Sequence, residues 1–304
     1  MSTQGVRWID DTTFHNDVDY IESLWHQTPI HNLELPLIDI GHGEPLVFVP
    51  ILAHLEFVYS RQIRTLSTSR RVILYRRQEM RTTPFGISDR VEELRQILDG
   101  LGLTRTDLIA HGDAAMVLFE FAIRYPQRCR SLIIIAQGAD YHISPHPFIW
   151  WLHELFIRFP VEYVLSADFL RGMVINYITN SHPNNHTAPA LSHHQIEEQF
   201  KKIHQWPFVY KCSILPIIHN FDIRKRLNTL TMPILLINRK DDALSPESKT
   251  RWLAQHLPNC AGYHIVSGKE RFFMYSRDET VTPLIQAFLA ARQTQQGSIK
   301  QLQQ

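Results

Sequence analysis

The chain has 304 residues, of which 44% are hydrophobic and 20% charged, and this composition is typical of a soluble globular protein with a sizeable core. A formal net charge of +1 argues against a general nucleic-acid binder and against attachment to anionic membranes through charge. Cys129, Cys212 and Cys260 lie far apart, which predicts reduced thiols rather than disulfides or a zinc site. Residues 1–11 do not resemble a signal peptide and no apolar run reaches membrane-spanning length, so we expect a cytoplasmic protein.

The first part of the chain predicts a short helix and three strands. Residues 19–26 are expected to form the helix after an ordered lead-in. The alternating pattern of residues 33–40, the glycines of 41–43 and the apolar run 46–49 predict two strands joined as a hairpin. A further buried strand is predicted over 72–75.

Residues 107–135 organise the rest of the chain. They follow a predicted helix that is capped by Ser88 and ends at Gly102. The stretch itself predicts a buried strand, a sharp turn at 111–113, a helix stopped by Pro126 and a second apolar strand. This is one βαβ step of a parallel sheet, with the turn at the carboxyl end of a strand, where open α/β sheets place their chemistry.

The order of these motifs is similar to the nucleophile elbow of the α/β-hydrolase family, in which a G-x-S-x-G turn joins a strand to a helix. In the common family pattern the nucleophile lies fourteen residues before the proline of R-Y-P, which is Pro126 here, so the expected position is 112. Position 112 is glycine, and glycine has no side chain that can attack a substrate. The resemblance implies a mostly parallel central sheet flanked by helices, with the nucleophile missing.

The segment after this step resembles the helical lid of the family. Residues 140–220 contain no clear strand but several aromatic-rich helical stretches, which predicts a cap inserted between core segments 1–139 and 221–304. The side chains expected to line an apolar pocket under this cap are Trp150, Trp151 and Phe156. The alternative is that these aromatic residues only pack the cap onto the core.

The other two members of the catalytic triad map onto later loops. Residues 238–246 match the acid loop of the family and place Asp242 at the triad acid. Residues 267–273 match the loop of the catalytic histidine, and that position is Arg271. Because arginine stays charged, it cannot accept a proton as a general base. Conventional serine-hydrolase activity is therefore not expected.

Two loops near the expected site also depart from the family pattern. Where relatives carry His-Gly, whose following N–H helps to form the oxyanion hole, this chain has Pro50 and Ile51, followed by Leu52. The loop after strand 72–75 carries two glycines in relatives, whereas residues 76–83 contain none. The resemblance therefore implies an altered oxyanion hole.

Several roles stay open for the charged residues. Asp113 is an alternative nucleophile, since related dehalogenases and epoxide hydrolases use aspartate, and His111 is a nearby candidate base. The competing explanation is that Asp113 only favours the positive end of the helix that follows. Arg271 is expected either to pair with Asp242, which we favour, or to face a cavity and bind a carboxylate or phosphate.

Two classes of function follow. The first is a non-hydrolytic protein that binds a small apolar or amphipathic molecule under its lid, with an anionic group as an option. The second is an enzyme with atypical hydrolase, lyase or isomerase chemistry that uses Asp113 or His111 with Asp242 and Arg271. No cofactor and no metal are expected, because the histidines spaced four apart in the cap are separated by prolines.

Overall fold

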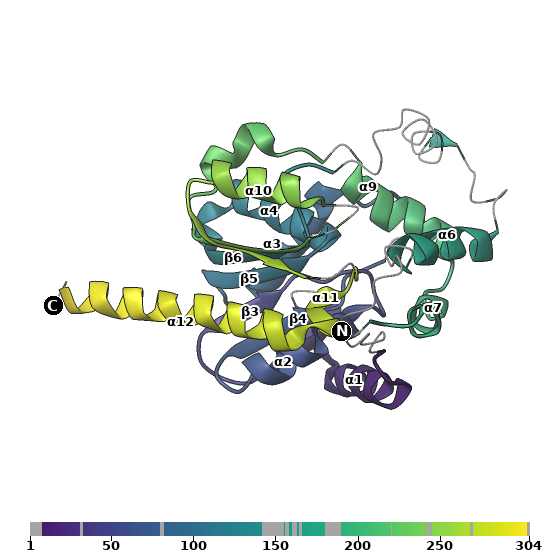
Figure 1. Ribbon diagram of the computed structural model, residues 1–304, viewed down its shortest axis with the longest axis horizontal. Helices are drawn as coiled ribbons and strands as arrows, with labels where there is room; N and C mark the ends of the chain where they lie inside the picture. The colour runs from purple at the N-terminus through teal and green to yellow at the C-terminus, as the bar shows by residue number, and fades with distance from the viewer. Residues whose placement is uncertain are drawn as a thin grey trace, which may run out of the picture.

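A computed structural model gives the fold. It describes residues 8–30, 33–79, 82–141, 155, 158–159, 163, 166–179, 190–219, 221–240, 242, 245–267 and 270–302. Eight strands form one sheet in the order β1-β2-β4-β3-β5-β6-β7-β8 (Figure 1). The strands are β1 (His26–Ile30), β2 (Leu33–Ile40), β3 (Pro45–Phe48), β4 (Arg71–Tyr75), β5 (Thr106–His111), β6 (Cys129–Ile135), β7 (Ile234–Arg239) and β8 (Cys260–Val266). The pairs among β3 to β8 are all parallel, whereas β2 pairs antiparallel with both β1 and β4, which confirms the predicted mostly parallel sheet.

Helices cover both faces of this sheet. Figure 1 shows α3, α4 and α10 above the strands, and α2 and α12 below them. Their bounds are α2 (Ser60–Leu66), α3 (Ile87–Gly100), α4 (Asp113–Arg124), α10 (Glu247–His256) and α12 (Asp278–Leu302). The remaining α-helices of the described residues are α1 (Asp11–Leu24), α6 (Ala167–Thr179), α7 (His193–Lys201), α8 (Trp206–Val209), α9 (Leu215–Ile218) and α11 (Phe273–Ser276). Every residue of β5 and β6 is buried, as expected for central parallel strands that are covered on both faces.

The predicted hairpin between β2 and β3 is wrong. Strand β4 lies between them, pairing antiparallel with β2 and parallel with β3. Gly41, between β2 and β3, lies where two backbone segments approach closely. It has a φ of 78°, and a Cβ atom there would lie 2.2 Å from the Arg70 carbonyl oxygen. The alternating apolar pattern identified both strands, but it could not identify their neighbours.

Several element boundaries also differ from those predicted. Helix α1 begins at Asp11 rather than at residue 19, because the Asp10 carboxylate accepts the Thr13 N–H at 2.8 Å and caps it. The prediction that Ser88 caps this helix is wrong. Helix α3 starts after Gly86, whose N–H donates to Asp89 Oδ2 at 2.8 Å. Helix α12 continues to Leu302, so the glutamine-rich end of the chain is helical.

The two ends of the predicted cap insertion lie side by side. Asp140 and Asp222 form an isolated antiparallel bridge, the Tyr141 N–H donates to the Phe221 carbonyl at 3.0 Å, and the Ile223 N–H donates to the Ala139 carbonyl at 2.9 Å. Between β6 and β7 the described residues form helices and no strand. This arrangement is compatible with a cap over 140–220, and the domain division stays a prediction. Among the helices of the described residues, none is both long and apolar enough to cross a bilayer.

One contact between α1 and α7 predicts a pH dependence. The His15 Nε2 atom lies 2.9 Å from Glu198 Oε2, and this hydrogen bond raises the pKa of His15. Partial desolvation opposes this shift, and the charges of Glu198 and Asp11 add to it. Because the folded-state pKa is raised, the pair stabilises the fold fully at pH values below the ordinary imidazole pKa of about 6.5. This contribution is lost as the pH rises through the folded-state pKa. The side chain of His15 is 47% exposed, so the effect on stability is small.

An NMR titration of the His15 ring measures this directly. We expect a pKa above the ordinary value, which falls towards it in Glu198→Gln. Glu197→Gln is the matched control, because Glu197 pairs with Lys201 on the same helix and should leave His15 unchanged. An unshifted His15 in the native protein would contradict the contact.

Candidate functional site

The turn between β5 and α4 has the form of a nucleophile elbow. Gly112 follows the last residue of β5 and has φ 61° and ψ −126°, a backbone conformation that residues other than glycine adopt only with strain. Its N–H donates to the Ile135 carbonyl at 2.9 Å, and its carbonyl accepts the Ala115 N–H at 3.0 Å. The sharp turn predicted at the carboxyl end of the central strand is therefore present, with glycine at its apex.

The guanidinium of Arg271 occupies the space above this glycine. Arg271 follows β8, and a Cβ atom built on Gly112 would lie 2.6 Å from its Nη2 atom and 3.5 Å from its Cζ atom. The first contact is shorter than a Cβ atom tolerates, so any side chain at position 112 would force Arg271 to move. A side chain at position 112 and the end of the Arg271 side chain thus compete for the same space.

Asp242 holds two arginines at this edge of the sheet. Its Oδ2 atom lies 2.8 Å from Arg239 Nε and 3.6 Å from Arg271 Nη1, and its Oδ1 atom accepts the Ser245 N–H at 2.9 Å. The side chains of Asp242 and Arg239 are fully buried, and that of Arg271 is 11% exposed. Burial alone favours the protonated carboxyl, but the charges of Arg271 and Arg239 outweigh it and hold the pKa of Asp242 below its ordinary value. Of the two arrangements expected for Arg271, the described residues have the ion pair.

His111 lies beside the same residues but is poorly suited to act as a base. It is buried, its Nε2 atom is 3.0 Å from the carbonyl oxygen of Arg271, and its ring lies near those of Phe272 and Phe273. Burial, followed by the charge of Arg271, lowers the pKa of His111 to about 3. The imidazole is therefore neutral at neutral pH and is a weak proton acceptor.

Asp113 contacts a different arginine. As the first residue of α4 it places its carboxylate at the positive end of the helix, as expected, and its Oδ2 atom lies 3.2 Å from Arg77 Nη1. Arg77 Nε in turn donates to Glu79 Oε1 at 2.7 Å, and the same oxygen accepts the Ala53 N–H at 3.0 Å. A chain of charged groups thus links the elbow to the loop after β3. Among the ion pairs of the described residues, Asp113 pairs with Arg77 and Arg271 pairs with Asp242.

Sequence reasoning missed Arg77 and Glu79. Their only signal was the loop over 76–83, in which Glu79 stands where the family pattern has its first glycine. Glycine at that position leaves space beside the oxyanion loop, whereas here a carboxylate fills it and binds the Ala53 N–H. The side chain of Arg77 is only 2% exposed, so this ion pair is part of the interior.

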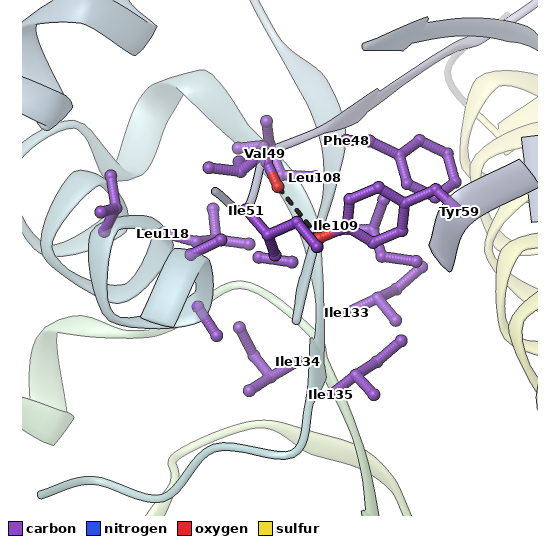
Figure 2. Close-up of a cluster of buried hydrophobic side chains, with 14 of the residues drawn as sticks. Phe48, Val49, Ile51, Tyr59, Leu108, Ile109, Leu118, Ile133, Ile134 and Ile135 are labelled. Carbon is purple, nitrogen blue, oxygen red and sulfur yellow. Dashed lines mark hydrogen bonds between the residues drawn. The ribbon is translucent and has the colours of Figure 1, made fainter. Parts of the chain in front are cut away.

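The loop expected to form the oxyanion hole is anchored in the core. Pro50, Ile51 and Leu52 follow β3 and are all buried. Figure 2 shows Ile51 among Val49, Ile109 and Leu118, and the Tyr59 hydroxyl donates to the Val49 carbonyl at 3.2 Å (dashed in Figure 2). The apolar side chains that replace His-Gly therefore pack inwards instead of leaving an open, flexible loop.

The described residues bring together Gly112, His111, Asp242 and Arg271, with Asp113 on the adjoining side. Trp150, Trp151 and Phe156 lie outside the described residues, and the pocket under the cap stays a prediction. Within the part of the chain that the structure describes, no group of three or more His, Cys, Asp or Glu side chains is placed to hold a metal ion. Chemically, the assembled groups offer buried cations and a neutral imidazole but no nucleophile at the apex.

Comparisons with known proteins agree with this architecture. No family model matches the chain. A protein of Stutzerimonas stutzeri named as the carbamate hydrolase RutD is 27% identical over 210 residues, which cover 65% of this chain and 74% of that protein. The enol-lactonase of Burkholderia xenovorans has a TM-score of 0.66 at 16% identity, covering 87% of this chain and all of that one. The epoxide hydrolase of Bacillus megaterium has a TM-score of 0.65 at 17% identity, with coverage of 87% and 100%.

Proposed function

We propose that this chain, which has the α/β-hydrolase fold, is not a serine hydrolase and that it binds a small, mostly apolar molecule on the cap side of its elbow. The observation that carries the proposal is the Arg271 guanidinium, which takes up the space of a nucleophile side chain above Gly112. The aromatic-rich sequence of the cap supports an apolar ligand. The curated relative is named as a hydrolase, and the chemistry proposed here differs from that name.

The electrostatics of the site support the loss of hydrolysis. An acyl-enzyme mechanism requires a nucleophile and a base that takes its proton. Gly112 supplies no nucleophile, position 271 carries an arginine where the family has its histidine base, and the pKa of His111 is about 3. In a serine protease, loss of the nucleophile alone lowers kcat by on the order of 10⁶, so the change at position 112 would be sufficient by itself.

A second candidate is a hydrolase that uses Asp113, and the hydrolase name of the relative favours it. The Asp113 carboxylate is 25% exposed and lies directly beside the elbow apex, so a ligand could reach it. Its ion pair with Arg77 would lower its nucleophilicity, and no histidine stands at position 271 to activate water in a second step. We therefore rank this candidate below ligand binding.

Two measurements test the proposed function. Nitrophenyl esters and carbamates incubated with the purified protein should show no turnover above the buffer rate, and native mass spectrometry should detect a bound apolar molecule that is released on denaturation. Asp113→Asn serves as the discriminating variant. Turnover by the native protein that disappears in Asp113→Asn would replace the proposal with the Asp113 hydrolase, whereas an apoprotein with no retained molecule and no turnover would contradict ligand binding.

A further inference from the structure

A cavity of about 320 Å³ lies between β8 and the C-terminal helix α12, away from the elbow. Its walls include Leu235 near the start of β7, which pairs with Gly262 of β8. Gly112 and Asp242, by contrast, follow the carboxyl ends of β5 and β7. Because parallel strands end together at one edge of a sheet, the cavity and the elbow lie towards opposite ends of the strands. This cavity is therefore a separate site.

The cavity has an apolar wall and a cationic end. Leu284, Ala287 and Phe288 of α12 contribute apolar surface, and Arg292, one turn further along the helix, contributes a guanidinium. The Arg292 Cζ atom lies 5.8 Å from the centre of the Phe288 ring. In the described part of the chain, the Arg292 Nε atom is buried and makes no hydrogen bond. This cavity is half open to solvent, and its apolar walls with one charged group suit a small amphipathic molecule.

The surroundings of Arg292 favour an anion. Burial lowers the pKa of Arg292, and the charges of Arg105 and Arg130 lower it further, against the attraction of Asp107. Asp107 is already engaged, because its carboxylate accepts from Arg70 at 3.0 Å and from the Ser131 hydroxyl at 2.6 Å. The Asp107 carboxylate therefore compensates the charge of Arg292 only in part, and a bound anion would complete the compensation.

We infer that this cavity binds an alkyl monocarboxylate, with the carboxylate on Arg292 and the alkyl chain along the apolar wall of α12. The carboxylate would pair with the Arg292 guanidinium at the end of the cavity, a charge-assisted interaction. The chain would cover Leu284, Ala287 and Phe288. His264, also at the cavity, offers a second polar contact. The inference is independent of the proposed function at the elbow.

Isothermal titration calorimetry of the full-length protein with octanoate tests the inference. We expect binding to one site, and affinity at least about tenfold lower in Arg292→Gln, which removes the charge-assisted interaction. Ala287→Phe should lower the affinity similarly, because the larger side chain fills the cavity from an exposed position on α12. The matched control is Arg251→Gln, which removes an arginine whose side chain is 60% exposed on α10. This variant should bind octanoate with the affinity of the native protein.

Octanol, which keeps the alkyl chain without the charge, completes the experiment. It should bind at least about tenfold more weakly than octanoate to the native protein and equally weakly to Arg292→Gln. Circular dichroism checks that each variant is folded. Absence of octanoate binding, equal affinity for octanol and octanoate, or octanoate affinity that is unchanged in either cavity variant would overturn the inference.

Discussion

Replacing Asp242 by alanine should lower the free energy of unfolding by about 3–5 kcal/mol, because it removes the carboxylate of a buried ion pair. Asp242 is the carboxylate between Arg239, whose side chain is fully buried, and Arg271, which is 11% exposed. Removal of the carboxylate places two guanidinium groups against each other in a poorly solvated region, and it also removes the acceptor of the Ser245 N–H. Urea unfolding followed by circular dichroism measures the change.

A surface carboxylate provides the control for this prediction. Asp168 pairs with Arg171 on α6, and its side chain is 82% exposed, so Asp168→Ala should change stability by less than about 1 kcal/mol. Asp242→Asn should lie between the two variants, since it retains hydrogen-bonding capacity while losing charge. Equal stabilities of Asp242→Ala and Asp168→Ala would show that the buried ion pair contributes nothing to the fold.

The same residue predicts an acid sensitivity. The folded-state pKa of Asp242 is lowered, so the unfolded chain binds its proton at a higher pH than the folded chain does. The stabilising contribution is therefore present above the ordinary carboxyl pKa and is lost as the pH falls through the lower folded-state value. In Asp242→Asn this part of the acid dependence should be missing, which unfolding curves at several acidic pH values would reveal.

The local steps of the fold could be predicted from sequence, whereas the long-range pairings could not. Strands β5 and β6 are continuous apolar runs joined by a helix that ends at Arg124, just before Pro126. The hydrophobic pattern and the proline were therefore sufficient to predict them. The neighbours of β2 were predicted wrongly, because strand order depends on contacts between distant segments. Strand β1, with the sequence HQTPI, has too little apolar alternation to be recognised and pairs only at the edge.

The candidate site was predictable only in its positions along the chain. The spacing to Pro126 placed the elbow apex at Gly112, where the structure has the sharp turn. Whether Arg271 pairs with Asp242 depends on the paths of two loops and on the length of the side chain, which no sequence pattern encodes. The link from Asp113 through Arg77 to Glu79 joins residues from separate loops, so only the missing glycines hinted at it.

Gly112→Ser combined with Arg271→His should convert the protein into a slow esterase, with turnover of nitrophenyl acetate on the order of 10²-fold above the native rate. Serine alone should not suffice, because its Cβ atom would lie 2.6 Å from Arg271 Nη2 and no base would be present. Histidine at 271 removes this overlap and can be oriented by Asp242, as in a catalytic triad. Gly112→Ala with Arg271→His is the matched control, since it has the same Cβ atom but no hydroxyl.

The oxyanion side of the elbow limits how far this conversion can go. A developing oxyanion needs free backbone N–H groups, yet the Ala53 N–H donates to the Glu79 carboxylate at 3.0 Å. Adding Glu79→Gly releases that donor and removes a negative charge beside the reacting centre, while Arg77 keeps its contact with Asp113. The triple variant should therefore turn over faster than the double variant. A triple variant that is folded but slower would show that Glu79 supports the loop, and equal rates for the serine and alanine versions would show that position 112 does not carry the nucleophile.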